Sequence, residues 1–342
     1  MRPDLPRLLL PRTLRERLRA WADLRRTGRR GRYAPSPTGL QHRGNLRTAL
    51  LSWLVTRLQD GEWLLRLDDL DTPRNRPGAE AAILADLRWL GLVWDGPPIR
   101  QSERTGLYAS VLSCFRRGGL LYPCRCSRRS LADVSAPHGA SPVYPGHCRA
   151  RPPQPGPAQW GEQQGRLPSW RLALGPGPLR WSERLAAQGQ LDGPSQVGDV
   201  VLRRSDGFLA YHLATAVDEL SLGIADVVRG EDLWSSTGAQ VAVMELLGQS
   251  APDYWHVPLW RDASGQRLAK RSGSEGLEGL RERGLDAPGV IGLMAASLDL
   301  APAGARLSVT ELLAELRGRG GLAELERLLG ERGRPLRGGQ QA

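Results

Sequence analysis

A loop rich in proline and glycine runs into a helical pattern near residue 45, and this junction constrains the fold more than any other stretch. Residues 32–47 (Arg-Tyr-Ala-Pro-Ser-Pro-Thr-Gly-Leu-Gln-His-Arg-Gly-Asn-Leu-Arg) contain two prolines and two glycines. The apolar residues that follow have the spacing of one helix face: Leu46, Leu50, Trp53 and Leu54. His42, Gly44 and Asn45 therefore fall at a helix N-terminus, where free N–H groups and the helix dipole favour phosphate. A proline–glycine turn before an ordinary buried helix fits the same pattern.

Residues 62–74 (Glu-Trp-Leu-Leu-Arg-Leu-Asp-Asp-Leu-Asp-Thr-Pro-Arg) predict a buried strand that ends in clustered carboxylates. In an open α/β sheet, ligands bind beyond the carboxyl ends of the strands, which is where Asp68, Asp69 and Asp71 fall. The alternative is a charged loop that closes a strand. Residues 79–89 have strong helix propensity and predict a helix after this loop.

The chain has 342 residues, 40% of them apolar, which is enough for a substantial core and for two or three domains. No apolar run approaches the roughly 20 residues that span a bilayer, so we expect a cytoplasmic protein with no membrane partner. A net charge of +11 suits a polyanion such as nucleic acid, although solvated basic faces are also common.

The first thirty residues carry ten arginines against three carboxylates. Leu14, Leu18 and Trp21 can line one face of a short basic helix. The segment is poor in serine for a transit peptide, and it can equally be an arm that touches RNA. We expect a mobile, dispensable extension outside the fold.

The cysteines Cys124, Cys126 and Cys148 form, together with Tyr144, the pattern C-x-C…Y-x-x-x-C. In a reducing compartment, converging thiols in a segment with little core of its own indicate either free thiols or a structural Zn²⁺ site. His147 and His138 are alternative ligands to the tyrosine. Cys114 lies outside the pattern, and we expect it to be a buried thiol.

The second half of the chain offers weaker patterns. Residues 198–211 predict a β-hairpin with its turn at 205–207, and residues 224–233 predict a buried strand ending in Arg-Gly-x-Asp. Tyr211 and Arg229 are candidate ligand-binding residues, or a core tyrosine and a surface arginine. Leucine-rich stretches after residue 300 predict one or two short helices.

Lysine is nearly absent. Of the 47 basic residues, Lys270 alone is a lysine. Exposed solubilising charges tolerate either residue, but a compact ammonium aimed at one phosphate is not replaced by a planar guanidinium. The count indicates a specific role for Lys270, although chance retention remains an alternative.

These stretches resemble the class I aminoacyl-tRNA synthetases of the glutamyl and glutaminyl branch, over roughly residues 31–300. Residues 32–45 resemble the "HIGH" signature, with Asn45 in place of its final His. Residues 66–74 resemble R-I-E-D-T-D-x-x-R, with Asp68 in place of the Glu. Residues 267–271 resemble "KMSKS" in its "KLSKR" form: Lys270 matches the second lysine, whereas Arg267 and Ala269 replace the first lysine and the serine.

Two further features point within the branch to the glutamyl-queuosine tRNA(Asp) synthetases. The C-x-C…Y-x-x-x-C pattern occurs there with the tyrosine as fourth zinc ligand. The forty-odd residues after position 300 are also too few for a large anticodon-binding domain. A truncated enzyme that charges the 3′ end of tRNA(Glu), and a catalytically dead RNA-binding paralogue, are the alternatives.

The resemblance implies ATP-dependent activation of L-glutamate and its transfer to the queuosine base in the anticodon loop of tRNA(Asp), by a monomer. His42, Asn45 and Lys270 are then catalytic. ATP, with Mg²⁺, is bound by Thr38, Gly39, His42, Gly44, Asn45 and Lys270. Glutamate is bound by Arg32, Tyr33, Ala34, Pro35, Ser36, Asp68, Tyr211 and Arg229. One structural Zn²⁺ per chain is bound by Cys124, Cys126, Tyr144 and Cys148.

The implied fold is α/β, a Rossmann-like parallel sheet with an inserted zinc-binding subdomain. The expected segments are a basic extension (1–30), the first half of the catalytic domain (31–110), the inserted acceptor-like subdomain (111–195), the second half of the catalytic domain (196–260), the KMSKS-like loop with following helices (261–300) and a short tail (301–342).

Overall fold

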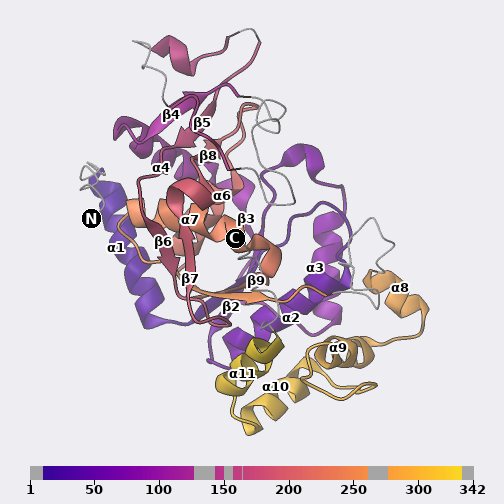
Figure 1. Cartoon of the computed structure of the whole chain (residues 1–342). Coiled ribbons are helices and arrows are strands. Elements are labelled where there is room, and N and C mark those ends of the chain that lie inside the picture. The colour runs from indigo at the N-terminus through magenta and orange to yellow at the C-terminus, as the bar shows by residue number, and fades with distance from the viewer. Residues whose placement is uncertain (1–10, 127–142, 150–156, 164, 261–275, 333–342) are drawn as a thin grey trace, which may run out of the picture.

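The computed structural model describes residues 11–126, 143–149, 157–163, 165–260 and 276–332. Its central sheet (Figure 1) consists of β1 (Arg30–Tyr33), β2 (Glu62–Leu67), β3 (Ile99–Arg100), β9 (Asp226–Gly230) and β10 (Asp253–Val257). The strand order is β10-β9-β1-β2-β3, and every neighbouring pair is parallel. The predicted α/β class with a parallel sheet is therefore confirmed.

Helix α2 (Arg43–Arg57) connects β1 to β2, as the sequence pattern predicts. All four residues of its predicted apolar face are buried. The predicted strand and helix that follow are also present, as β2 and as α3 (Ala79–Trp89). Gly31 on β1 lets the strand approach α2 closely, because a Cβ there would lie 1.9 Å from Thr56 Oγ1.

Both faces of the parallel sheet are covered. On β9, Val227 belongs to one apolar cluster and Val228 to the other, and Tyr254 and Trp255 on β10 divide in the same way. Alternate residues of a strand point to opposite faces, so the two clusters lie on opposite sides of the sheet. One cluster includes α2 together with α9 (Ala287–Ala296), α10 (Val309–Gly318) and α11 (Leu322–Arg332). The other includes α4 (Thr105–Arg117), α6 (Tyr211–Ser221) and α7 (Trp234–Leu246).

A second sheet lies at the top of Figure 1, formed by β4 (Leu121–Cys124), β5 (Ser169–Leu172) and β8 (Val200–Arg203), all antiparallel. A hairpin of β6 (Pro178–Trp181) and β7 (Gly189–Asp192) follows β5 in the chain. The expected boundary at residue 195 falls between β5 and β8, whereas in the structure these two strands pair in one sheet. The remaining short elements are η1 (Thr72–Arg74), η2 (Gln101–Arg104), η3 (Pro157–Trp160), η4 (Gly193–Val197), η5 (Glu231–Leu233) and α8 (Leu277–Glu282).

The predicted hairpin at 198–211 is only partly formed. Its turn is present, because Arg204 N donates to Phe208 O (2.8 Å) and Ala210 N donates to Leu202 O (2.9 Å). Its second arm is a single bridge, Arg203 to Leu209, since α6 begins at Tyr211. Tyr211 is therefore the first residue of a helix and not the end of a strand.

The expectation of a mobile N-terminal extension is wrong for residues 12–27. They form helix α1 (Arg12–Thr27), whose Leu14 and Leu18 are buried in the cluster that contains α6. The Arg25 guanidinium also donates to the backbone oxygen of Ser250 (2.5 Å). The spacing of the leucines predicts the helix, but the composition alone does not reveal the surface that it covers.

At the other end of the described chain, the leucine-rich stretches form α10 and α11, as predicted. A capping box at Ser308 and Glu311 starts α10. Among the described residues, no helix has the length and apolar content needed to cross a bilayer.

Candidate active site and cysteine cluster

A cavity of about 420 Å³ opens where β1, β2 and β9 end and α2 begins. Parallel strands end at one edge of their sheet, so side chains that are distant in sequence meet there. Twelve of the predicted site residues line it: Arg32, Tyr33, Ala34, Pro35, Ser36, Thr38, His42, Gly44, Asn45, Asp68, Tyr211 and Arg229. Gly39 is not among the lining residues, and Lys270, Arg267 and Ala269 lie outside the described residues.

The start of α2 forms one wall of the cavity. His42 is the residue before the helix, and its Nδ1 accepts from the backbone N of Asn45 (3.3 Å). The Asn45 amide donates to Gln41 Oε1 (3.1 Å), which also accepts from Tyr33 OH (2.8 Å). A Cβ at position 44 would lie 3.0 Å from the His42 ring and crowd it. Glycine at this position therefore leaves room for the ring. Because the positive end of the helix dipole lies at this wall, the cavity beside it suits an anion.

A buried ion network forms the floor of the cavity. Arg32 Nε contacts Glu219 Oε1 at 2.9 Å, and Arg66 Nη1 contacts the same oxygen at 3.3 Å. Arg66 Nε in turn donates to Asp68 Oδ1 (2.7 Å). Asp218, beside Glu219 on α6, accepts from Tyr108 OH (2.8 Å). Because each buried charge has an opposite partner, the network fixes Arg32 and Asp68 in place.

Burial and charge move the carboxyl groups of this network in opposite directions. Burial raises the pKa of Asp68 to about 6, although Arg66 opposes the shift. Burial also acts to raise the pKa of Glu219, but the guanidiniums of Arg32 and Arg66 outweigh it and lower that pKa. Glu219 is therefore a permanent anion, whereas Asp68 changes charge near pH 6.

Arg229 reaches the cavity from the end of β9 with a different set of partners. Its guanidinium donates to Thr237 Oγ1 (2.6 Å), Gln240 Oε1 (2.8 Å) and His256 Nε2 (3.2 Å). Tyr211 also lines the cavity and is 38% exposed. Its neighbour His212 has a pKa lowered to about 4, by burial and by the nearby Arg229. The cavity thus offers a fixed cation and a phenol to a ligand.

The chain returns to this cavity on both sides of residues 261–275, which are outside the described part. Trp260 lines the cavity, and the guanidiniums of Arg43 and Arg47 lie over its ring at 5.3 and 5.0 Å. Gly276 forms an isolated antiparallel bridge with His42. The segment that carries Lys270 therefore begins and ends beside the start of α2.

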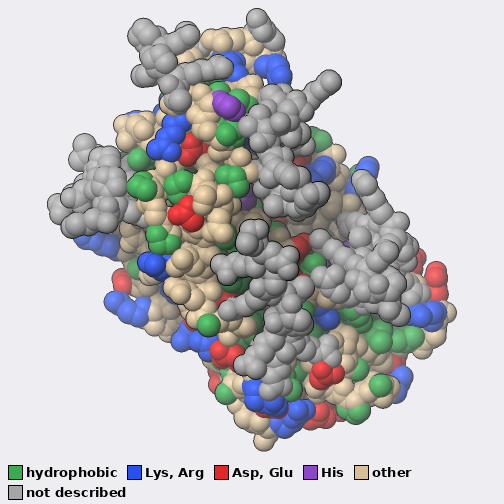
Figure 2. Space-filling model, in the orientation of Figure 1, with side chains coloured by type: hydrophobic (Ala, Val, Ile, Leu, Met, Phe, Trp, Pro, Cys, Tyr) green, Lys and Arg blue, Asp and Glu red, His purple; other side chains and the backbone are tan. Residues whose placement is uncertain are grey.

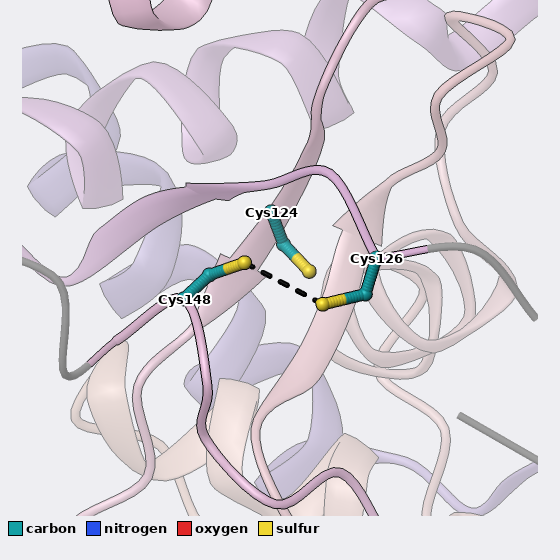
Figure 3. Close-up of side chains that lie close together, drawn as sticks. All are labelled: Cys124, Cys126 and Cys148. Carbon is teal, nitrogen blue, oxygen red and sulfur yellow. Dashed lines mark hydrogen bonds between the residues drawn. The ribbon is translucent and has the colours of Figure 1, made fainter. Parts of the chain in front are cut away.

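The predicted cysteine pattern converges in space. Cys124 and Cys126 lie at the end of β4 and just after it, and Cys148 approaches from a separate segment, with the sulfur atoms gathered together (Figure 3). The three sulfurs lie within 4.8 Å of one another. The Tyr144 OH lies 3.5 Å from Cys124 Sγ and 3.8 Å from Cys126 Sγ. Among the described residues, no histidine joins this group, and His138 lies outside them.

Three thiols at this spacing can hold a metal ion. A tetrahedral site with Zn–S bonds of about 2.3 Å requires sulfurs about 3.8 Å apart. Cys126 Sγ and Cys148 Sγ are 3.5 Å apart. All four cysteines are free thiols, and Cys114 is buried on α4 as expected.

Basic side chains do not gather in a single patch on the face drawn in Figure 2. Arg side chains are scattered over the described part of this face, with Asp and Glu side chains among them.

Several residues of the site were not identified from the sequence. Asp218 and Glu219 are adjacent carboxylates in a helix that is otherwise apolar, a pattern that signals buried charges in need of partners. Arg66 stands in a buried strand, which is a similar signal. Gln41, His256 and Trp260 carry no such signal. Only the fold brings Trp260 to the cavity, and Gln41 and His256 to residues that line it.

Comparison with known proteins matches residues 30–288 to the family described as tRNA synthetases class I (E and Q), catalytic domain. A curated protein of Parasynechococcus marenigrum (strain WH8102), "Glutamyl-Q tRNA(Asp) synthetase", is 57% identical over 85% of this chain and 90% of its own. A protein of the same name from Prochlorococcus marinus (strain MIT 9313) is 52% identical over 92% of this chain and 96% of its own.

A solved structure has the same fold. It is the crystal structure of a glutamate tRNA ligase from Elizabethkingia meningosepticum CCUG26117 in complex with its amino acid, with a TM-score of 0.70 and 27% identity. The match covers 84% of this chain and 64% of that one, so the present chain spans just under two thirds of its length.

Proposed function

The chain belongs to the class I tRNA synthetases of the glutamate and glutamine branch, and from this we propose that it activates L-glutamate with ATP and transfers it to queuosine in tRNA(Asp). Relatives that are 52–57% identical over most of both chains bear the name glutamyl-Q tRNA(Asp) synthetase. The observation that carries the proposal is the cavity in which an anion-binding helix start faces Arg32, Asp68 and Arg229.

In the first step, a carboxylate oxygen of glutamate's α-carboxyl group attacks the α-phosphorus of ATP. The bond between the α-phosphorus and the oxygen that bridges it to the β-phosphorus breaks. Glutamyl-adenylate forms and pyrophosphate leaves. In the second step a hydroxyl group of queuosine attacks the acyl carbon, an ester forms and AMP leaves. Both steps need positioning and charge neutralisation more than covalent help from the protein.

The start of α2 is the proposed ATP site. The polar side chains of His42 and Asn45 and the positive end of the helix dipole would hold the phosphates beside Gly44, with Thr38 and Gly39 in the preceding loop. Mg²⁺ accompanies the ATP. Lys270 supplies an ammonium to the phosphates as they separate. Support for Lys270 comes from its being the single lysine of the chain and from Trp260 and Gly276, which flank its segment at the cavity.

The floor of the cavity is the proposed glutamate site, with the backbone of Tyr33–Ser36 forming its edge. Asp68 takes the substrate's ammonium group, because it is a carboxylate held at the cavity by Arg66. Tyr211 and Arg229 take the side-chain carboxylate, and Arg32 supplies a further cation. An arginine fork binds a carboxylate through paired, charge-assisted hydrogen bonds and so favours glutamate over glutamine.

We also propose that the cysteine cluster binds one structural Zn²⁺. Cys124, Cys126 and Cys148 would supply thiolates, and the Tyr144 phenol is the fourth group close to them. The metal would tie the chain after β4 to the segment around residue 148. The monomeric state and a cytoplasmic location, which suits reduced thiols, complete the proposal.

Incubation of the full chain with labelled L-glutamate and total tRNA tests the function. We expect label on tRNA(Asp) that contains queuosine and none on tRNA that lacks it. Label on the 3′ end of tRNA(Glu) would instead favour a truncated glutamyl-tRNA synthetase. The second measurement is glutamate-dependent ATP–pyrophosphate exchange without tRNA. If no exchange occurs, the chain would instead be a catalytically dead RNA-binding paralogue. The identities to named relatives do not favour either alternative.

A further inference from the structure

Arg229 differs from the other two arginines in the floor of the cavity. Arg32 and Arg66 both contact a carboxylate of the network. The three hydrogen-bond partners of Arg229 are an alcohol, an amide and an imidazole, and it makes no ion pair with a carboxylate within the ranges that the structure describes. Its side chain is nevertheless almost completely buried, with 4% of the residue exposed. Among the described residues, no carboxylate is thus in contact with its guanidinium, and Glu219 acts on this charge only from a longer distance.

A carboxylate, Glu183, lies behind Arg229, and the imidazole of His256 separates the two. Glu183 Oε2 lies 2.6 Å from His256 Nδ1, and Oε1 accepts from the backbone N of His256 (3.1 Å). The opposite nitrogen, His256 Nε2, faces Arg229 Nε at 3.2 Å. Glu183 follows β6, His256 lies on β10 and Arg229 on β9, so three separate segments build this chain of contacts.

The direction of each hydrogen bond follows from the chemistry of the donors. An arginine Nε–H can only donate, so His256 Nε2 must be the acceptor and carry no proton. The single proton of the neutral ring is then on Nδ1, where it is donated to Glu183. Burial lowers the pKa of His256, and the nearby Arg229 lowers it further against the opposing effect of Glu183, which keeps the ring neutral. The groups around the ring are Glu183, Arg229, Thr237, Trp234 and Tyr254.

We propose that Glu183 and His256 are positioning residues that hold the Arg229 guanidinium toward the cavity without neutralising it. Glu183 orients the His256 ring, and the ring in turn orients Arg229. The ring also separates the Glu183 carboxylate from the Arg229 guanidinium. A substrate with a side-chain carboxylate then provides the missing anion, whereas the corresponding amide does not. The inference rests on the proposed function, because it takes Arg229 as the receptor for the glutamate side chain.

Substitution of Glu183 tests the hydrogen-bond direction. Its two oxygens accept from His256 N, His256 Nδ1 and Trp181 Nε1, so all three neighbours are donors. In Glu183→Gln an NH₂ group replaces one acceptor. It can face Nδ1 only if the ring proton moves to Nε2, and that proton would meet Arg229 Nε–H. We expect the dissociation constant for L-glutamate, measured by calorimetry, to rise about tenfold, with ATP binding unchanged within about twofold.

Two variants of His256 separate positioning from packing. His256→Gln keeps an oxygen acceptor that can reach Arg229, and we expect weaker binding than in wild type but preference for glutamate over glutamine. His256→Leu removes the acceptor and should lose about tenfold or more in that preference. Glu326→Gln is the matched control, since it removes the carboxylate of the half-exposed Arg184–Glu326 pair next in sequence to Glu183. We expect wild-type glutamate binding in this control.

The ring itself provides a readout independent of ligand binding. In full chain labelled with ¹⁵N-histidine, we expect His256, assigned by its loss in His256→Gln, to be neutral near pH 7.5 with the proton on Nδ1. A proton on Nε2 would overturn the proposal. Unchanged glutamate affinity and preference in both Glu183→Gln and His256→Leu would overturn it while leaving the proposed function intact. A wild-type chain that binds no glutamate would refute the proposed function itself.

Discussion

An isolated antiparallel bridge joins His42, which precedes helix α2, to Gly276, which precedes helix α8. The two residues are 234 positions apart in the printed sequence, yet they meet at the proposed phosphate site. Trp260 lines the same cavity from the other end of the intervening segment. The described residues on both sides of the KMSKS-like segment, Trp260 and Gly276, therefore lie beside the start of α2.

We predict that Lys270→Ala lowers the rate of glutamate-dependent ATP–pyrophosphate exchange by about 100-fold or more, since a charge beside the separating phosphates is lost. Lys270→Arg keeps the charge but changes its shape, and should retain an intermediate rate. The measurement is kcat for exchange at saturating ATP and glutamate. A near-normal rate in Lys270→Ala would refute the role of this residue.

The KM for glutamate should depend on pH through Asp68. Its pKa is raised to about 6 by burial, so the carboxylate is charged above that pH and neutral below it. Below pH 6 we expect the KM for glutamate to rise about tenfold per pH unit, because only the ionised form pairs with the substrate's ammonium group. The KM for ATP, measured from pH 5 to 8, is the internal control.

The same shift has a consequence for stability with the opposite sense. A carboxyl group whose pKa is raised on folding stabilises the folded chain below its unfolded value near 4. This contribution is lost as the pH rises through about 6. Asp68→Asn should remove both effects, and a KM that still rises below pH 6 in this variant would assign the titration to another group.

The cysteine cluster should retain metal through purification without chelators. We predict about one zinc per chain by elemental analysis, lost in Cys148→Ser because a thiolate ligand is removed. Tyr144→Phe tests the fourth ligand, and should weaken zinc binding if the phenol coordinates the ion. His147→Ala is the control that should leave the metal in place. A zinc content near zero in wild type would leave the three thiols as core residues.

Glu219→Gln should destabilise the fold. The substitution leaves the guanidiniums of Arg32 and Arg66 buried with less negative charge around them, and such losses cost about 3–5 kcal/mol. Glu16→Gln, in the exposed Arg12–Glu16 pair, should cost less than about 1 kcal/mol. Urea unfolding of both variants gives the comparison. Equal losses would mean that the buried network does not determine stability.

Helix α1 should contribute to stability although its sequence resembles a dispensable leader. Leu18 is 4% exposed, so Leu18→Ala should lower the free energy of unfolding by about 2–5 kcal/mol. The neighbouring Arg19 is exposed, and Arg19→Ala should have little effect. A similarly small change in the free energy of unfolding of both variants would mean that α1 contributes little to stability.

Much of the fold could be predicted because local patterns agree with it. The apolar spacing after Asn45 marks α2, and the run at 62–67 marks β2. The motif residues at the start of α2 and just after β2 fall at the sheet edge where ligands bind. The twelve lining residues were identified largely through a resemblance to known motifs. Physics alone left an ordinary turn and a charged loop as alternatives at the same positions.

The residues that the sequence did not reveal are those whose function depends on pairing across the chain. Glu219 is separated by 187 positions from Arg32, and nothing near either residue identifies the partner. The packing of α1 has the same cause, because the leucine spacing predicts an amphipathic helix but not the surface of α6 that it covers. The error at Tyr211 has a local cause. The second arm of the hairpin consists of one bridge, and so short a strand has no sequence pattern that separates it from the helix that follows.

The strand order β10-β9-β1-β2-β3 also bears on how the protein is made. β1 is the third strand across the sheet but the first to leave the ribosome, and its partner β9 follows almost two hundred residues later. A nascent chain that has reached only α4 carries the start of the proposed nucleotide pocket with one side of its central strand unpaired. Until translation passes β9, this half-built sheet presents an open edge, on which a chaperone or a misplaced strand can act.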